Sequence, residues 1–156
     1  MQRMISKSAH QTLQIAAGFA KGLKPGAVVG LIGDLGAGKT TFVQGMARGL
    51  GIDPEYYVNS PSFTLVNEYR GRGTPLIHVD LYRIDKPREG ETLGLDEYLA
   101  SGAVIAVEWI ERMPDLETRM TDRVEIRVAG DHRREIEIAT PFGCDSALDF
   151  GRSSSC

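Results

Sequence analysis

The sequence has little of what marks a secreted, zinc-binding or membrane protein. Its only two cysteines, Cys144 and Cys156, lie near the C-terminus, and no Cys-x-x-Cys or Cys/His spacing indicates a zinc site or a disulfide framework. The longest apolar runs are about seven residues, whereas a membrane-spanning helix needs roughly twenty. The opening stretch, MQRMISKSAH, lacks the apolar core of a secretory signal. We therefore expect a cytoplasmic protein that makes no membrane contact.

A large charge of either sign is missing as well. The 18 lysines and arginines nearly balance the 21 acidic residues, which gives a net charge of −3. A protein that grips RNA by itself usually presents a strongly basic surface, so independent RNA binding is disfavoured. Short basic groups at Arg83, Lys86 and Arg88 and at Arg133 and Arg134 are more typical of solvated surfaces, although one could meet a phosphate.

The most informative stretch is GDLGAGKTT, residues 33–41. It follows an apolar run at residues 27–33 and precedes a segment, residues 39–50, with a helical spacing of apolar side chains. Strand, glycine-rich loop and helix in this order are the context in which G-x-x-x-x-G-K-[ST] binds nucleotide phosphates. A glycine-rich turn that merely joins strand to helix is the weaker alternative. The residues that match the motif are Gly33, Gly38, Lys39 and Thr40.

The chemistry of phosphate binding explains these residue types. Glycine at Gly33, Gly36 and Gly38 lets the loop turn its backbone N–H groups toward phosphate oxygens with no Cβ in the way. Lys39 brings a mobile positive charge to the β- and γ-phosphates. Thr40 brings a hydroxyl for Mg²⁺, and the N-terminus of the following helix adds a partial positive charge. The stretch therefore predicts a site for a nucleotide with Mg²⁺.

Two carboxylates end apolar strands further along the chain. Asp80 closes the run LIHVD, and Glu108 closes AVIAVE. Because the carboxyl ends of parallel strands form the edge where α/β proteins bind ligands, we expect both acids at the site. An acid there can hold Mg²⁺ or its waters, or can orient an attacking water. The pattern does not decide which acid contacts the metal.

The remaining pattern predicts a single α/β domain at residues 1–139, with a mainly parallel central sheet, flanking helices and antiparallel edge strands. The last two strands are expected to form a hairpin at one edge, residues 113–122 look irregular, and residues 140–156 read as a flexible tail. The expected helices cover residues 8–23, 39–50 and 95–100, and the expected strands cover residues 1–7, 27–33, 63–69, 76–80, 103–110, 123–128 and 135–139.

Three features leave alternatives open. Residues 60–64, SPSFT, are either a turn before a strand or a switch segment that senses the γ-phosphate. Trp109 is either a core residue or a partner contact, and strand alternation places it on the opposite face from Glu108. His10 and Thr12, in the first helical turn, lie either at a solvated helix end or beside a nucleotide base.

Several missing motifs narrow the class of enzyme. The chain has no N-K-x-D, the guanine-reading motif, which argues against a GTPase. It has no arginine-dense lid segment, which argues against a small-molecule kinase. No residue stands out as an intrinsic arginine finger, and an ATPase without one is often slow until a partner completes its site.

Taken together, four blocks are recognisable: GDLGAGKTTF, SPSFTLVNEY, HVDLYR, and VEW followed by ERMPD. In order and spacing the chain resembles the TsaE (YjeE) family of bacterial ATPases for tRNA threonylcarbamoyladenosine biosynthesis, over residues 1–139. The resemblance implies a P-loop fold and Mg²⁺-dependent ATP hydrolysis, weak alone and stimulated by partners. The implied partners are the transferase subunits TsaD and TsaB, with tRNA reached through them, and the implied product is the modified adenosine beside the anticodon.

The resemblance also implies roles for residues of this sequence. Thr40 and Glu108 look like the Mg²⁺ ligands, Asp80 resembles the acid needed for hydrolysis, and Thr64 resembles part of a switch segment. Arg134 matches a family arginine near the nucleotide through a looser alignment. The chain departs from the pattern at Ser62, where threonine is frequent, and at Ile110, where proline is common. The phosphate-binding residues implied by the motif are Gly33, Asp34, Leu35, Gly36, Ala37, Gly38, Lys39, Thr40 and Thr41.

Two other functions remain to be weighed against this one. A small-molecule or nucleoside kinase could use the same loop, and it would consume the γ-phosphate on a hydroxyl acceptor. A nucleotide-sensing adaptor would bind tightly without turnover. The two placed acids, Asp80 and Glu108, favour hydrolysis over sensing.

Overall fold

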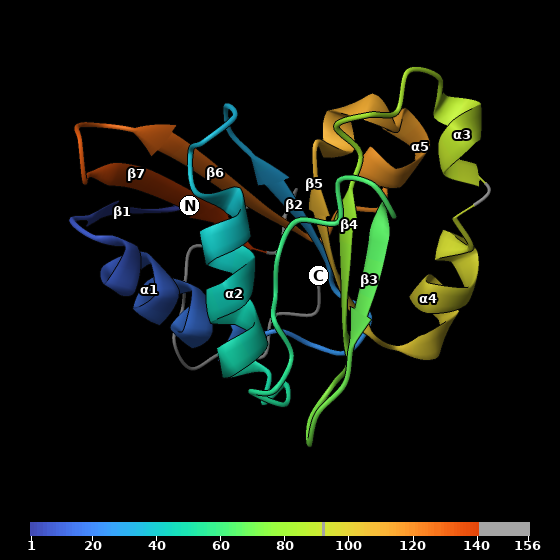
Figure 1. Cartoon of the computed structure of the whole chain (residues 1–156), viewed down its shortest axis with the longest axis horizontal. Helices are drawn as coiled ribbons and strands as arrows, with labels where there is room; N and C mark the ends of the chain where they lie inside the picture. The colour runs from blue at the N-terminus through green and yellow to red at the C-terminus, as the bar shows by residue number, and fades with distance from the viewer. Residues whose placement is uncertain (92, 141–156) are drawn as a thin grey trace.

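The computed structural model describes residues 1–91 and 93–140, which build a seven-stranded sheet with helices on both faces (Figure 1). The strand order is β1-β7-β6-β2-β5-β4-β3. In the centre, β6, β2, β5 and β4 run parallel, while β7, β1 and β3 pair antiparallel with their neighbours. The expected α/β domain with a mainly parallel centre is therefore confirmed. The strands are β1 Gln2–Ser6, β2 Val28–Ile32, β3 Val66–Tyr69, β4 Leu76–Asp80, β5 Val104–Glu108, β6 Asp122–Val128 and β7 Arg134–Ala139.

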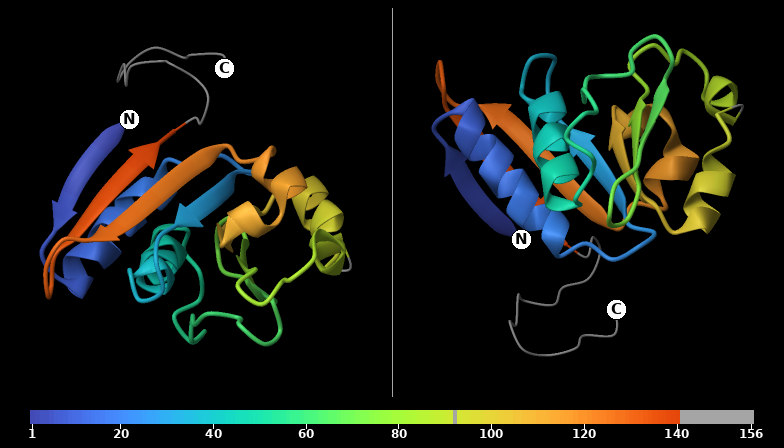
Figure 2. Two further views of the ribbon diagram at one scale, coloured as in Figure 1. Left: turned by 90° about the horizontal axis from the view of Figure 1, so that it is seen from above. Right: turned by 60° about the horizontal axis from the view of Figure 1, so that its bottom comes forward.

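Helices α1 and α2 lie side by side on one face of the sheet, and shorter helices cover the other face beside β4 and β5 (Figures 1 and 2). Strand β2 is apolar throughout and β5 is apolar up to Glu108, which suits burial on both faces. Each face has its own apolar cluster, one under α1 and α2 and the other under α4, η1 and α5. The helices are α1 Ala9–Lys21, α2 Lys39–Gly49, α3 Pro87–Glu91, α4 Leu95–Ser101, α5 Pro114–Glu117 and a 3-10 turn, η1 Ile110–Arg112.

Close packing of α1 against α2 holds the second helix, and with it the glycine-rich loop, in place. A Cβ at Gly45 or Gly49 of α2 would collide with the backbone of Leu13 or Ala17 of α1. Ser8 caps the N-terminus of α1, because its hydroxyl accepts a hydrogen bond from the backbone N–H of Gln11 at 3.0 Å.

Two strand predictions need correction. The hairpin of β6 and β7 does not lie at an edge, because β1 adds to β7 on one side and β2 pairs with β6 on the other. The strand predicted over residues 63–69 begins only at Val66, because Leu65 has a left-handed φ of 68° and donates its N–H to the carbonyl of Pro61. The chain at residues 61–65 is therefore a turn.

The segment predicted to be irregular also contains structure. Within residues 113–122, helix α5 occupies Pro114–Glu117, with proline at its first position where the missing N–H costs nothing. None of the helices in residues 1–91 and 93–140 is long and apolar enough to span a membrane. The predicted tail, residues 140–156, lies outside the described residues apart from residue 140, so the domain boundary stays a prediction.

Candidate functional site: a phosphate loop beside two buried acids

The glycine-rich loop joins the carboxyl end of β2 to the first turn of α2. Gly36 and Gly38 have φ angles of 82° and 109°, in the left-handed region that residues with a Cβ rarely adopt. A Cβ at Gly33 would collide with the carbonyl of Ile126 on β6. The backbone angles of the loop therefore favour glycine at Gly36 and Gly38, and the close approach of β6 requires it at Gly33.

Lys39 is buried at the start of α2, with its ammonium group aimed back into the loop. Its Nζ donates a hydrogen bond to the carbonyl of Gly33 at 2.5 Å and lies 3.8 Å from the centroid of the Trp109 ring. Burial lowers the pKa of Lys39, and neighbouring carboxylates oppose this shift by favouring the charged form. These carboxylates belong to Glu108, Glu111, Asp80 and Asp34.

The two strand-end acids lie directly opposite each other. In the parallel pairing of β4 with β5, Asp80 is in register with Glu108, and both side chains are buried. The prediction that these acids meet at one edge of the sheet is confirmed. Thr40 reaches the same point from α2, because its hydroxyl lies 3.4 Å from Oε1 of Glu108.

The other oxygen of Glu108 contacts His78, a residue on β4. His78 Nε2 lies 2.6 Å from Glu108 Oε2, and both side chains are buried. Nothing in our sequence analysis assigned His78 a role. A polar residue inside the otherwise apolar strand LIHV was the signal that could have found it.

Asp80 is held through both of its carboxylate oxygens. The backbone N–H of Tyr82 donates to Oδ1 at 2.9 Å, and the Ser60 hydroxyl donates to Oδ2. The stretch at residues 60–64 is therefore tied to the site through its first serine. Thr64 instead is exposed, with its hydroxyl 3.4 Å from Asn67 Oδ1, so the structure does not bring it to the acids and its contact with nucleotide stays a prediction.

These groups surround one pocket of about 530 Å³. Of the predicted residues, Gly33, Asp34, Ala37, Thr64 and Arg134 do not line it. Arg134 nevertheless supports the loop, because its Nε donates to the carbonyl of Ala37 at 2.9 Å. The lining residues are Leu35, Gly36, Gly38, Lys39, Thr40, Thr41, Ser60, Ser62, Asp80, Tyr82, Arg83, Glu108 and Trp109.

The predicted placement of Trp109 on the opposite face from Glu108 is wrong. Strand β5 ends at Glu108, and Trp109 has a left-handed φ of 60°, so alternation no longer applies. Both side chains line the pocket. Trp109 packs against Tyr82, with ring centroids 5.0 Å apart, and the Arg112 guanidinium lies 5.6 Å from its ring.

The first turn of α1 does not line the pocket. Thr12 is buried, and its hydroxyl shares a 2.7 Å hydrogen bond with that of Ser6, which ties α1 to β1. His10 is exposed. The interpretation as a solvated helix end therefore holds for His10 and is wrong for Thr12, and contact of this turn with a nucleotide base stays a prediction.

The donor set at the pocket fits a magnesium ion held together with a nucleotide. Thr40 and Glu108 offer two oxygen ligands side by side, with Asp80 in register beside Glu108. Within residues 1–91 and 93–140 no group of three or more His, Cys, Asp or Glu side chains forms a metal cage. Mg²⁺ typically needs no such cage, since it uses one or two protein ligands, substrate phosphates and waters.

Comparisons with known proteins identify the family. The family model described as "Threonylcarbamoyl adenosine biosynthesis protein TsaE" matches residues 6–136. Over 123 residues the chain is 46% identical to the tRNA threonylcarbamoyladenosine biosynthesis protein TsaE of Bacillus subtilis, covering 79% of this chain and 73% of the relative. The protein of the same name from Nostoc is 38% identical over 148 residues, which is 92% of this chain and 88% of the relative.

Solved structures agree with the sequence matches. A crystal structure of YdiB from Bacillus subtilis superposes with a TM-score of 0.72 at 38% identity, covering 90% of this chain and 85% of the other. The family match at residues 6–136 covers strands β2 to β6, the loop and the two acids on their strand ends. This chain belongs to the TsaE family.

Proposed function

We propose that this chain serves the biosynthesis of threonylcarbamoyladenosine in tRNA, as a cytoplasmic ATPase that supports the transferase subunits TsaD and TsaB. Family membership supports the pathway. One observation carries the ATPase activity: the loop lysine, the Thr40 hydroxyl and two in-register acids converge on one pocket.

Nucleotide binding falls to the loop and to Lys39. The left-handed glycines let the loop turn its backbone N–H groups toward phosphate oxygens, apart from the N–H of Ala37, which donates to the carbonyl of Asp34. The N-terminus of α2 adds its partial positive charge. The hydrogen bond of Lys39 goes to the neutral carbonyl of Gly33 and not to a carboxylate. Its charge therefore stays available for the β- and γ-phosphates. Leu35 lines the same pocket with an exposed side chain.

Thr40 and Glu108 would hold Mg²⁺, which when bound neutralises charge on the phosphate oxygens. Asp80 lies on the neighbouring strand and orients the attacking water by accepting its hydrogen bond. The hydrogen bonds from Tyr82 and Ser60 fix the plane of the Asp80 carboxylate, so little reorganisation precedes the attack. Hydrolysis then releases ADP and free phosphate.

The chain alone is expected to be slow. Arg83 is an arginine at the pocket, but its guanidinium lies 4.3 Å from the centroid of the exposed Phe63 ring. We infer that an arginine engaged with this ring does not neutralise transition-state charge on the phosphates, and supplying that charge is worth about 10³-fold or more in other phosphate-transfer proteins. Partner subunits would therefore raise the rate.

Phosphate release from ATP tests this function, measured for the chain alone and with TsaD, TsaB, tRNA and Mg²⁺. We expect a slow rate alone, a higher rate with partners, and loss of both in Lys39→Ala. Lys21→Ala, in an exposed part of α1, is the matched control and should keep both rates. Stoichiometric transfer of phosphate to a small-molecule acceptor would indicate the kinase alternative, and tight binding without turnover would indicate an adaptor.

A further inference from the structure

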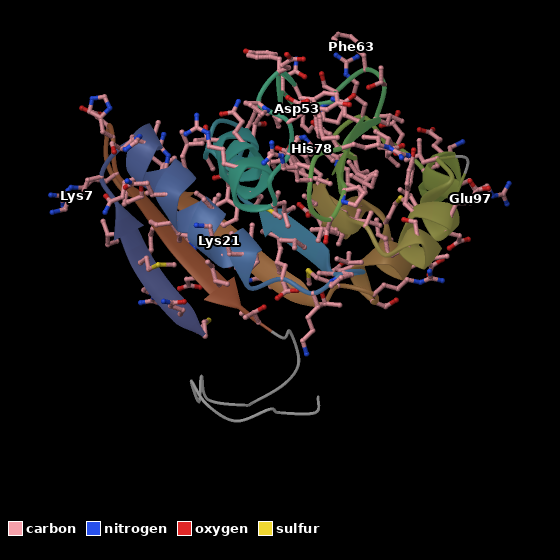
Figure 3. The ribbon with its side chains drawn as sticks, turned by 90° about the horizontal axis from the view of Figure 1, so that it is seen from below. Lys7, Lys21, Asp53, Phe63, His78 and Glu97 are labelled. Atoms are coloured by element: carbon pink, nitrogen blue, oxygen red, sulfur yellow. The ribbon has the colours of Figure 1, made fainter. Side chains whose placement is uncertain are left out.

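His78 is the one histidine on the parallel strands, and it is fully buried. Its neighbours along β4, which include Leu76, Ile77 and Val79, are buried and apolar. Figure 3 shows His78 in the interior between α2 and the sheet, whereas Phe63 projects from the surface. Burying an imidazole costs free energy unless its nitrogens are hydrogen-bonded. A residue with only a packing role at this position would be apolar.

Only one of the two ring nitrogens of His78 has a hydrogen-bond partner in the part of the chain that the structure describes. Nε2 lies 2.6 Å from Glu108 Oε2, while Nδ1 has no partner among the described residues. An ionised carboxylate can only accept, so Nε2 carries the hydrogen of this bond. The contact with Glu108 is therefore what offsets the burial of this polar side chain.

The two oxygens of Glu108 are thereby divided between two tasks. Oε2 faces His78, and Oε1 lies on the Thr40 side at 3.4 Å from its hydroxyl. The last torsion of a glutamate is broad, so an unanchored carboxylate would turn freely. Lys39 is a charged alternative partner, since Glu108 contributes the largest favourable charge interaction with its ammonium group. If Glu108 paired with Lys39, its carboxylate would not be available to the metal, and the lysine charge would not be available to the phosphates.

We propose that His78 is a positioning residue: its Nε2–H holds Glu108 Oε2, so that Oε1 stays beside Thr40 to receive Mg²⁺ with the nucleotide. This role rests on the proposed function, because it needs Glu108 to be a ligand. Partners that orient metal ligands through hydrogen bonds typically affect metal affinity by about 10- to 100-fold when removed.

Three variants separate positioning from packing. His78→Leu keeps the volume and removes the donor, His78→Gln keeps a donor close to the Nε2 position, and His78→Asn keeps polarity but is too short to reach Glu108. Binding of a fluorescent ADP analogue is measured across a Mg²⁺ titration and again in EDTA. We expect the Mg²⁺ concentration that gives half of the maximal increase in analogue binding to rise at least about 10-fold in His78→Leu and His78→Asn. In His78→Gln it should rise by less than about 3-fold. In EDTA, all three variants should bind the ADP analogue with the affinity of the unchanged chain.

The outcomes distinguish this inference from the proposed function. Absence of Mg²⁺-dependent binding in the unchanged chain would contradict the proposed function itself. Normal Mg²⁺ dependence in both His78→Leu and His78→Asn, with only a lower melting temperature, would reduce His78 to a packing residue. Should the leucine variant not fold, the comparison of His78→Asn with His78→Gln decides, since both are polar.

The position of the hydrogen on the His78 ring can be measured without nucleotide or metal. Long-range ¹H–¹⁵N spectra of the free chain should show His78 with the hydrogen on Nε2. A hydrogen on Nδ1 alone would overturn the proposal. In a double-variant cycle, adding His78→Leu to Glu108→Gln should leave the Mg²⁺ dependence of Glu108→Gln unchanged, because His78 acts through that carboxylate.

Discussion

The ammonium group of Lys39 lies 3.8 Å from the centroid of the Trp109 ring, so the loop lysine is in contact with the chain's single tryptophan. Phosphates that draw Lys39 toward them must weaken this cation–π contact, which is worth about 0.5–2 kcal/mol. We therefore expect tryptophan emission to change when ADP or ATP binds, and titration of the emission gives the affinity.

Two controls accompany the fluorescence measurement. Adenosine lacks phosphates and should leave the emission unchanged at concentrations where ADP saturates. Trp109→Phe should abolish the signal while nucleotide binding, followed by calorimetry, persists. An equal emission change with adenosine would assign the signal to a contact of Trp109 with the base and not to the movement of Lys39.

Asp80→Asn should lower turnover far more than affinity. The amide keeps the shape of the side chain, with its oxygen accepting from the Tyr82 N–H and its NH2 group donating to the Ser60 hydroxyl, but it loses the negative charge that orients water. We expect kcat in the full partner complex to fall about 10²-fold or more, while the KM for ATP stays within a few-fold.

The control for Asp80→Asn is Asp85→Asn, which changes an exposed acid in the same segment. Its kinetics should match the unchanged chain. A kcat for Asp80→Asn equal to that of the unchanged chain would assign the acid role elsewhere, with Glu108 as the remaining strand-end candidate.

A pair of glycine substitutions tests the packing that positions the loop. A Cβ at Gly49 would meet the backbone of Ala17, so Gly49→Ala should lower the free energy of unfolding by about 1–3 kcal/mol. At Gly18, exposed within α1, a Cβ meets nothing within 4 Å. Gly18→Ala should raise the free energy of unfolding by about 0.5–1 kcal/mol, because helical glycine costs backbone entropy. Urea denaturation measures both, and equal effects would refute the close helix contact.

Asp122 should make stability fall as pH rises. Burial raises the pKa of this carboxyl in the folded chain, partly opposed by the hydrogen bond from Thr121. The folded state then holds the proton more tightly than the unfolded state, so stability is lost as pH rises from the unfolded pKa through the folded pKa. Asp122→Asn should therefore raise the urea midpoint at neutral pH, with the gain shrinking toward acid pH.

The matched control for Asp122→Asn is Asp131→Asn, in the exposed turn before β7. It should leave the urea midpoint and its pH profile unchanged. A gain from Asp122→Asn that is the same at every pH would show that the charge of Asp122 is not its cause.

Local patterns predicted the centre of the site correctly. The apolar strand, the glycines and the helix after them follow rules that operate over a few residues, so β2, the loop and α2 could be placed from sequence. The meeting of Asp80 and Glu108 followed from one further rule, that parallel strands end at a common edge.

What could not be predicted depends on contacts between distant segments. The pairing of β1 with β7, which moves the hairpin off the edge, joins opposite ends of the domain. Trp109 was misplaced because a single left-handed residue ends the alternation of β5. The link from Ser60 to Asp80 and the one from His78 to Glu108 span 20 and 30 residues. The first depends on the path of a loop, and the second on the register of β4 against β5.

The most direct test of the central claim is multiple-turnover formation of threonylcarbamoyladenosine on tRNA, reconstituted from TsaD and TsaB with the remaining substrates and ATP, with and without this chain. The account predicts many modified tRNAs per transferase with the unchanged chain, and a yield close to the level without it for Lys39→Ala and Asp80→Asn. Equal yields with the unchanged chain, with either variant and with no chain at all would contradict the claim that its ATP hydrolysis supports transferase turnover.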